Sequence, residues 1–418
     1  MHTDDPQQFP LLPGSSEDFA LVETLLRNAG FDELTILRTL KIKQMSDLSE
    51  VKPDELDLSA VPKVLAILIR LFLFTEPVRQ REVEEVMDSE TLQALKALDV
   101  LRPGVSEPRA GRADAIYYTP VFLYPLADLV IASDRHNNPD GSPFTPPPDI
   151  VFPAISGGTL LFLRLMSTSP AESVLDLGSG TGVAALIMSG SVRRAVASDI
   201  TSRAAHFARF NRLLNRRFNV EVVQGDLFES VEGQTFDRIV AHPPYVPSLS
   251  QETIYRDGGD TGETLVRRIV EGLPKYLRPG GTYYSLSIGI DTTAAKFEER
   301  ARGWLGSSQD QFDVIFALAE ERSCEQFARD RAVLTDCSDP LEVERWNEVF
   351  RKAGACGFVF GALVIHRRDL GEVTPTGEPG PLTIRVQLTD STSGSDFERF
   401  FRRHSGSSGP EFPTAPPQ

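Results

Sequence analysis

The chain has 418 residues, of which 41% are hydrophobic and 24% are charged, and its formal net charge is −16. This size and composition indicate an ordinary globular protein that is long enough for two or more domains. The negative charge argues against nucleic-acid binding over the whole surface, because affinity for phosphates comes mostly from Lys and Arg.

The sequence predicts neither a membrane span nor a secretory signal. The most apolar run, residues 64–74, is too short to cross a bilayer and contains Arg70, and the first five residues are polar. We therefore expect a cytoplasmic protein with no membrane partner. The three cysteines, Cys324, Cys337 and Cys356, are odd in number and widely spaced, so they predict neither a disulfide framework nor a metal site.

The N-terminal part is expected to be mostly helical. We predict a disordered tail over residues 1–16 and a first domain over residues 17–135. The domain is expected to contain several amphipathic helices and then β-structure over residues 117–133. The helical patterns cover residues 20–29, 33–40, 61–74 and 82–98.

A proline-rich linker is predicted between this domain and the next. Residues 136–149 contain several prolines, which cannot continue a helix or a central strand because they lack the amide donor. A helix over residues 155–166 is expected to open the second domain. Its start, from Ser156 to Thr159, is interpreted either as a polar contact to a ligand or as an ordinary helix N-terminus.

The most informative feature is a glycine-rich turn directly after an apolar strand over residues 174–177. Gly178, Gly180 and Gly182 let the backbone approach a ligand closely, and a helical pattern follows from Val183. A dinucleotide fingerprint needs its third glycine at position 183, so the spacing is wrong for NAD.

Further strands follow in an alternating α/β pattern. One ends at Asp199, a second precedes Asp226, and a third leads into His242, Pro243, Pro244 and Tyr245. A helix is expected over residues 262–276. Together with the strand before the glycines, seven strands are predicted, the last three over residues 282–288, 312–319 and 358–366.

These motifs, in this order, resemble those of class I S-adenosylmethionine (SAM) methyltransferases, in the small-methyltransferase-domain branch that includes the release-factor glutamine methyltransferases. The resemblance implies an α/β fold with a seven-stranded Rossmann-like sheet over residues 150–369, whose last strand runs antiparallel. It leaves a strand and helix extension over residues 370–403 and a disordered tail over residues 404–418. The N-terminal domain is similar to the winged-helix modules that precede some methyltransferase cores.

The resemblance also implies the cofactor and the residues that hold it. SAM would lie over the glycine-rich turn, with its ribose bound by Asp199 and its adenine near Asp226. The cofactor-binding set expected on this basis is Asp176, Gly178, Ser179, Gly180, Gly182, Asp199, Asp226, Leu227 and His242.

The acceptor motif is expected at His242, Pro243, Pro244 and Tyr245, which form the catalytic set. In the family an Asn stands at the first position and accepts hydrogen bonds from a planar NH₂, while the Tyr ring stacks on the substrate. A neutral imidazole accepts a single hydrogen bond. His242 is therefore interpreted as a hydrogen-bond acceptor, a general base or a structural residue, and Arg256 as a contact for an anionic substrate group.

The function expected is SAM-dependent methylation of nitrogen on a protein side chain or an RNA base. A small-molecule methyltransferase that dimerises through its N-terminal domain is the alternative enzyme, and a non-catalytic SAM-binding protein is the alternative of another class. The winged-helix-like part, acidic over residues 82–90, is not expected to read DNA. The arginines of residues 201–218 are interpreted as the solvated face of a helix or a local nucleic-acid patch.

Overall fold

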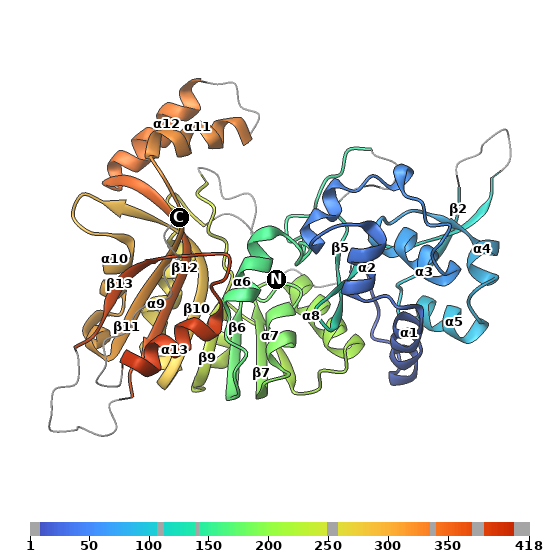
Figure 1. Ribbon diagram of the computed structural model, residues 1–418, viewed down its shortest axis with the longest axis horizontal. Coiled ribbons are helices and arrows are strands. Elements are labelled where there is room, and N and C mark those ends of the chain that lie inside the picture. The colour runs from blue at the N-terminus through green and yellow to red at the C-terminus, as the bar shows by residue number, and fades with distance from the viewer. Residues whose placement is uncertain are drawn as a thin grey trace, which may run out of the picture. The chain divides into compact units, whose positions relative to one another are not determined.

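The computed structural model describes residues 9–106, 113–136, 138, 142–248, 258–334, 340–369 and 380–404. They form two compact units whose elements are labelled in Figure 1. The first unit comprises Met1–Leu160, Ser179–Gly190 and Asp199–Gln224, and the second comprises Leu161–Gly178, Ser191–Ser198 and Gly225–Gln418.

The first unit begins with the predicted helical region. The Ser15 side chain accepts a hydrogen bond from the Asp18 amide at the start of α1, and Gly30 ends the helix with a left-handed φ of 71°. Leu11, which the sequence placed in a disordered tail, is fully buried. The helices are α1 (Ser16–Ala29), α2 (Glu33–Leu40), α3 (Lys63–Leu68), α4 (Gln80–Glu84) and α5 (Ser89–Ala97).

A small antiparallel sheet accompanies these helices. Its order is β1-β3-β2, formed by β1 (Val78–Arg79), β3 (Ala115–Tyr118) and β2 (Arg102–Val105). The five helices α1 to α5 together confirm the mostly helical N-terminal region that the sequence predicted.

The first unit also contains a β-hairpin that is hydrogen-bonded to one long helix. The hairpin joins β4 (Val121–Leu126) to β5 (Leu129–Asp134), and the helix is α8 (Ser202–Leu214). The Asn211 amide accepts from the Ala132 N–H at 2.8 Å and donates to the Ala132 carbonyl at 2.9 Å. Asn215 makes the same pair of bonds to Val130. The unit also contains α7 (Val183–Met188) and β8 (Val220–Gln224).

The second unit is built on a large sheet in which the strand order is β13-β11-β12-β10-β9-β6-β7. β6 runs parallel to β7 and β9, β9 runs parallel to β10, and β12 is antiparallel to both of its neighbours. The strands are β6 (Ala171–Leu177), β7 (Val192–Asp199), β9 (Phe236–Ala241), β10 (Leu277–Thr292), β11 (Phe312–Arg322), β12 (Ala355–Arg367) and β13 (Thr383–Gln387).

Continuous burial explains why these strands form a central sheet. The last five residues of β6 are all buried, as expected for a parallel strand that is covered on both faces. All seven predicted strands are present, with β8 in the first unit, and the antiparallel β12 agrees with the prediction. β13 and α13 (Gly394–His404) correspond to the strand and helix expected beyond the core.

Apolar helix faces cover the sheet of the second unit. α13 crosses one face of it in Figure 1, and Phe397, Phe400 and Phe401 on this helix are buried. A separate aromatic cluster joins Phe327 and Trp346 to Phe358, near the start of β12. The other helices are α6 (Gly157–Leu165), which begins in the first unit, α9 (Thr264–Tyr276), α10 (Phe297–Trp304), α11 (Cys324–Leu334) and α12 (Pro340–Lys352).

In the part of the chain that the structure describes, no helix combines the length and apolarity needed to cross a membrane.

A buried arginine attaches the extra strand β13 to the core. Arg385 donates to Asp291 at 2.7 and 2.8 Å and to Glu298 at 2.6 Å, and all three side chains are at most 14% exposed. Two carboxylates that are excluded from water in this way depend on the guanidinium for compensation.

We expect Arg385→Met to lower the free energy of unfolding by about 3–5 kcal/mol, because it leaves two buried carboxylates without their partner. Urea unfolding at neutral pH measures this loss. Arg399→Met on α13 is the matched control, since the Arg399 side chain is 57% exposed. Equal stabilities of the two variants would contradict this account.

Candidate functional site

The candidate site begins where three neighbouring strands end at the same edge of the sheet. Leu177 at the end of β6 is in register with Ser198 of β7 on one side and with Ala241 of β9 on the other. The glycine-rich turn, Asp199 and His242 therefore each follow a strand that ends at this edge. In open α/β sheets, ligands bind beyond the carboxyl ends of the strands.

The glycine-rich turn has the backbone conformation that its sequence predicts. Gly178, Gly180 and Gly182 have φ angles of 68°, 52° and 80°, which favour glycine. A Cβ atom on Gly178 or Gly180 would meet nothing within 4 Å, so open space lies beside the turn. A Cβ on Gly182 would lie 3.1 Å from the Ala208 Cβ, so this glycine serves the packing of α8.

Asp199 is bound to the turn. Its Oδ2 accepts from the Gly180 N–H at 2.9 Å, and its Oδ1 accepts from the Thr201 N–H at 3.0 Å. The Ser179 hydroxyl is buried and has no hydrogen-bond partner among the described residues. A buried hydroxyl without a partner is costly in a folded protein, so a polar ligand group beside the turn would stabilise it.

The remaining predicted cofactor residues differ in their surroundings. Asp176 is buried at the end of β6, with 2% of its surface exposed. Asp226, expected near an adenine, is paired with Arg268 of α9 at 2.8 Å, and a third of its side chain is exposed. Leu227 adopts a left-handed φ of 50°, and its carbonyl lies 3.5 Å from the Ser198 hydroxyl.

The His242 imidazole lies in an aromatic stack. Its ring centroid is 5.1 Å from that of Phe162 on α6 and 5.4 Å from that of Tyr245, with interplanar angles of 27° and 29°. The His242 Nε2 and the Tyr245 hydroxyl are 3.4 Å apart. The Tyr245 ring also contacts Phe360 of β12, with centroids 5.9 Å apart.

This aromatic environment determines the protonation of both rings. Burial lowers the pKa of His242 from 6.5 to about 4 and raises the pKa of Tyr245 to about 12. The imidazole is therefore neutral at physiological pH and offers one acceptor nitrogen, and the phenol keeps its proton. An imidazole with so low a pKa is a weak general base, which favours the hydrogen-bonding role for His242.

The second glycine-rich loop supports the backbone of the acceptor motif. The Gly258 N–H donates to the Val246 carbonyl at 2.8 Å, and the Ser248 N–H donates to the Gly259 carbonyl at 3.1 Å. A Cβ on Gly258 would lie 2.8 Å from the Pro244 oxygen and from the Tyr245 Cα. Only glycine permits this close approach at position 258, and Gly259 has a left-handed φ of 83°, which also favours glycine.

A buried ion pair anchors that loop. Glu263 accepts from Arg300 of α10 at 2.7 and 2.6 Å and from the Ile290 N–H of β10 at 2.8 Å. Arg300 also donates to the Ile290 carbonyl at 2.8 Å. The loop beneath Tyr245 is thus tied to both a strand and a helix of the second unit.

Several positioning residues could not be identified from the sequence. The sequence did not identify Phe162 or the Glu263–Arg300 pair as part of the site. Glu263 directly follows Gly262, and its position could have indicated a role in holding the glycine-rich loop. Ser156 and Thr159 hydrogen-bond to each other at 2.9 Å, as in an ordinary helix N-terminus. Arg256 lies outside the described residues. No group of three or more His, Cys, Asp or Glu within the described ranges is arranged to hold a metal ion.

Comparison with known proteins supports one family. The model of the methyltransferase small domain matches residues 153–288. A putative protein N5-glutamine methyltransferase from Methanocaldococcus jannaschii is 33% identical over 150 residues, which cover 34% of this chain and 74% of that protein.

Two bacterial relatives match over a smaller share of their length. The release factor glutamine methyltransferase of Geobacter sulfurreducens is 29% identical, over 36% of this chain and 57% of that protein. The ribosomal protein uL3 glutamine methyltransferase of Bordetella pertussis is 30% identical, over 36% of this chain and 55% of that protein. The chain therefore spans little more than half the length of these two enzymes.

The fold and these relatives define the class of the protein as the class I SAM-dependent methyltransferases. Within that class, the chain belongs to the small-methyltransferase-domain family, as the sequence predicted.

The low pKa of His242 predicts that the protein becomes less stable as the pH falls. As the pH falls below 6.5, the unfolded chain takes up a proton that folded His242 accepts only near pH 4. This residue should therefore lower the free energy of unfolding by up to about 3 kcal/mol between pH 6.5 and pH 4. Urea unfolding across this range should show a shallower pH dependence for His242→Asn. Tyr245→Phe retains the imidazole and should keep the wild-type slope; equal slopes in all three proteins would exclude the effect.

Proposed function

We propose that this chain is a cytoplasmic enzyme that transfers the methyl group of SAM to the side-chain amide nitrogen of a glutamine in a protein. The neutral, ring-stacked His242 at the start of the acceptor motif carries this proposal. The names of the relatives, each a glutamine methyltransferase, support the acceptor.

The glycine-rich turn fits SAM in its chemistry. Open space beside Gly178 and Gly180, together with the buried Ser179 hydroxyl, suits a ligand with polar groups close to the backbone. When bound, SAM supplies a methyl group activated by a sulfonium. We propose that it is held by Asp176, Gly178, Ser179, Gly180, Gly182, Asp199, Asp226 and Leu227.

His242 would orient the acceptor amide. The amide NH₂ presents two hydrogens, of which one would be accepted by the neutral imidazole and the second by a backbone carbonyl of the His242–Pro244 segment. Pro243 and Pro244 have no N–H, so this segment presents acceptors to the amide without a competing donor of its own. The Tyr245 ring would cover the plane of the amide.

This arrangement suits methyl transfer because the reaction depends mainly on alignment. Holding two reactants in line can supply about 7–11 kcal/mol of the barrier. His242 does not need to remove a proton before the transfer, in agreement with its low pKa. The proposed work of the Gly258–Gly262 loop and of the Glu263–Arg300 pair is therefore to keep the acceptor motif rigid.

Cofactor binding can be tested without turnover. Titration of the purified chain with SAM in a calorimeter should give saturable binding, and Asp199→Ala should weaken it at least about tenfold by removing charged hydrogen bonds to the ligand and the turn. Asp310→Ala, at an exposed position, is the control and should bind as the wild type does. Absence of binding heat for the wild type would remove the proposed cofactor role.

The acceptor can be tested by incubating the chain with labelled SAM and protein, RNA and small-metabolite fractions. Label should appear in protein, on glutamine, as located by mass spectrometry of the labelled peptide. His242→Asn should retain this transfer because an amide oxygen also accepts hydrogen bonds, whereas His242→Ala should lower it at least about tenfold. Label confined to RNA or metabolites, or loss of transfer in His242→Asn but not in Tyr245→Phe, would refute the proposal.

A further inference from the structure

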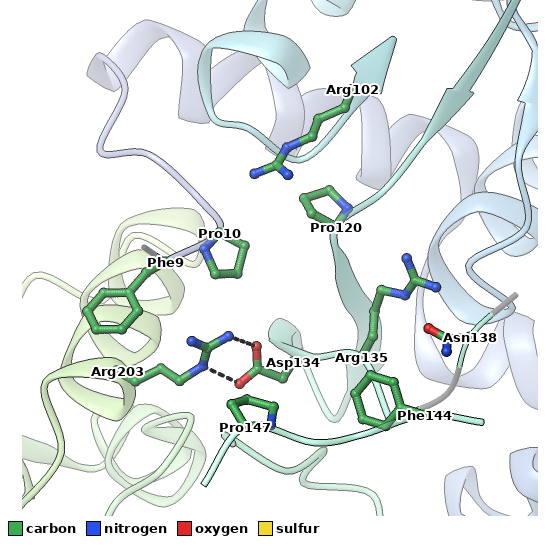
Figure 2. Close-up of a pocket in the computed structure, with 10 residues that line it drawn as sticks. All are labelled: Phe9, Pro10, Arg102, Pro120, Asp134, Arg135, Asn138, Phe144, Pro147 and Arg203. Atoms are coloured by element: carbon green, nitrogen blue, oxygen red, sulfur yellow. Dashed lines mark hydrogen bonds and ion pairs between the residues drawn. The ribbon is translucent and has the colours of Figure 1, made fainter. Parts of the chain in front are cut away.

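The first unit contains a cavity that the proposed methyl transfer does not use. Its volume is about 380 Å³, and it is lined by three arginines, one aspartate, one asparagine, two phenylalanines and three prolines (Figure 2). Three arginines around one cavity are unexpected in a chain with a net charge of −16.

The three arginines come from three separate elements of the first unit. Arg102 is the first residue of β2, Arg135 directly follows β5, and Arg203 lies in the first turn of α8. Figure 2 shows their side chains around the same space. The amides of Asn211 and Asn215 join β5 to α8, so the positions of Arg135 and Arg203 are fixed relative to each other.

Acidic partners orient two of these arginines but leave donors on each. Arg203 donates to Asp134 through Nε at 2.7 Å and Nη2 at 2.6 Å, and the two side chains are only 12% and 7% exposed. Arg102 is held by Asp99 in the same two-bond manner. A guanidinium has five N–H donors, of which a bidentate carboxylate occupies two. The carboxylates therefore fix the arginines in place without exhausting their capacity to bind an acceptor.

The Asp134 carboxylate already accepts three hydrogen bonds from the protein. Its Oδ2 accepts from the Val151 N–H at 2.8 Å and from the Arg203 Nε, and its Oδ1 accepts from the Arg203 Nη2. Three guanidinium groups and one carboxylate line the cavity, while Asp99 and Asp134 offset the charges of Arg102 and Arg203. The guanidinium donors that remain can form charge-assisted hydrogen bonds with an oxyanion.

Apart from Asn138, the rest of the lining is apolar, and three of its residues are prolines, which have no backbone donor. Phe9 and Phe144 supply rings, and Pro10, Pro120 and Pro147 have no N–H. The Arg203 guanidinium lies 5.4 Å from the centre of the Phe9 ring. The segment carrying Phe9 is attached to α8, because the His206 Nε2 and the Pro10 carbonyl oxygen are 3.0 Å apart. A ligand would thus meet guanidinium donors with rings and prolines beside them (Figure 2).

We propose that this cavity binds a small molecule that carries an oxyanion, either a carboxylate or a phosphate, on an aromatic ring. The oxyanion pairs with Arg135 and the remaining donors of Arg102 and Arg203, and the ring packs on Phe9 and Phe144. The volume equals that of roughly a dozen liquid waters, which suits a molecule of one or two rings. This site is independent of the proposed methyl transfer.

The test is calorimetric titration of the full chain at low salt with phenyl phosphate, benzoate and the neutral benzyl alcohol. At least one anion should bind about tenfold or more tightly than benzyl alcohol, as expected for charge-assisted hydrogen bonds. The anion that binds more tightly shows whether the site prefers a phosphate or a carboxylate. Arg135→Gln should weaken anion binding about tenfold. Arg209→Gln, the same change at an exposed position of α8, should leave it unchanged.

Circular dichroism and thermal unfolding establish that each variant is folded, and Arg102→Gln replaces Arg135→Gln if the latter is not. Phe9→Leu should weaken the binding of phenyl phosphate more than the binding of inorganic phosphate, because only phenyl phosphate has a ring that packs on Phe9. The proposal is overturned if no anion binds at millimolar concentration. It is also overturned if benzyl alcohol binds as tightly as the stronger of the two anions, or if Arg209→Gln weakens anion binding as much as the cavity variant does.

Discussion

The parallel register of β6 with β7 and β9 is the constraint on which the proposed chemistry depends. Because Leu177 pairs with Ser198 on one side and with Ala241 on the other, the glycine-rich turn, the acid after β7 and the acceptor motif all follow strands that end level with one another. A shift of one residue in either pairing would exchange the faces of the following side chains.

The acceptor motif combines aromatic packing with a rigid backbone. Phe162 and Tyr245 exclude water from the His242 imidazole and keep it neutral, so the exchange of Asn for His replaces an amide acceptor with an uncharged ring acceptor. Beneath it, the close approach of Gly258 and the buried Glu263–Arg300 pair leave the backbone little freedom. The strength of such a pair lies in its hydrogen bonds, since burying the charges is itself costly.

The strands and the glycine-rich turn could be predicted because they follow from local signals: apolar runs, glycines at alternate positions and acids at strand ends. The stacking of Phe162 on His242 could not be predicted, since it joins side chains 80 positions apart through tertiary packing. The low pKa of His242 has the same origin, as a sequence gives only the ordinary value. Asp226 lies where the motif predicts, yet its ion pair with Arg268 depends on how α9 packs. The Arg385 triad likewise arises from long-range contacts.

The side-chain amides of Asn211 and Asn215 have a consequence for how the chain avoids self-association. A two-stranded ribbon ordinarily exposes a row of backbone donors and acceptors to which a strand of another molecule can add. At Val130 and Ala132, each amide bonds both the N–H and the C=O of one residue, as a neighbouring strand would. A helix thus caps the β5 edge of the ribbon at these two residues, and loss of either asparagine would expose a template for intermolecular β-pairing.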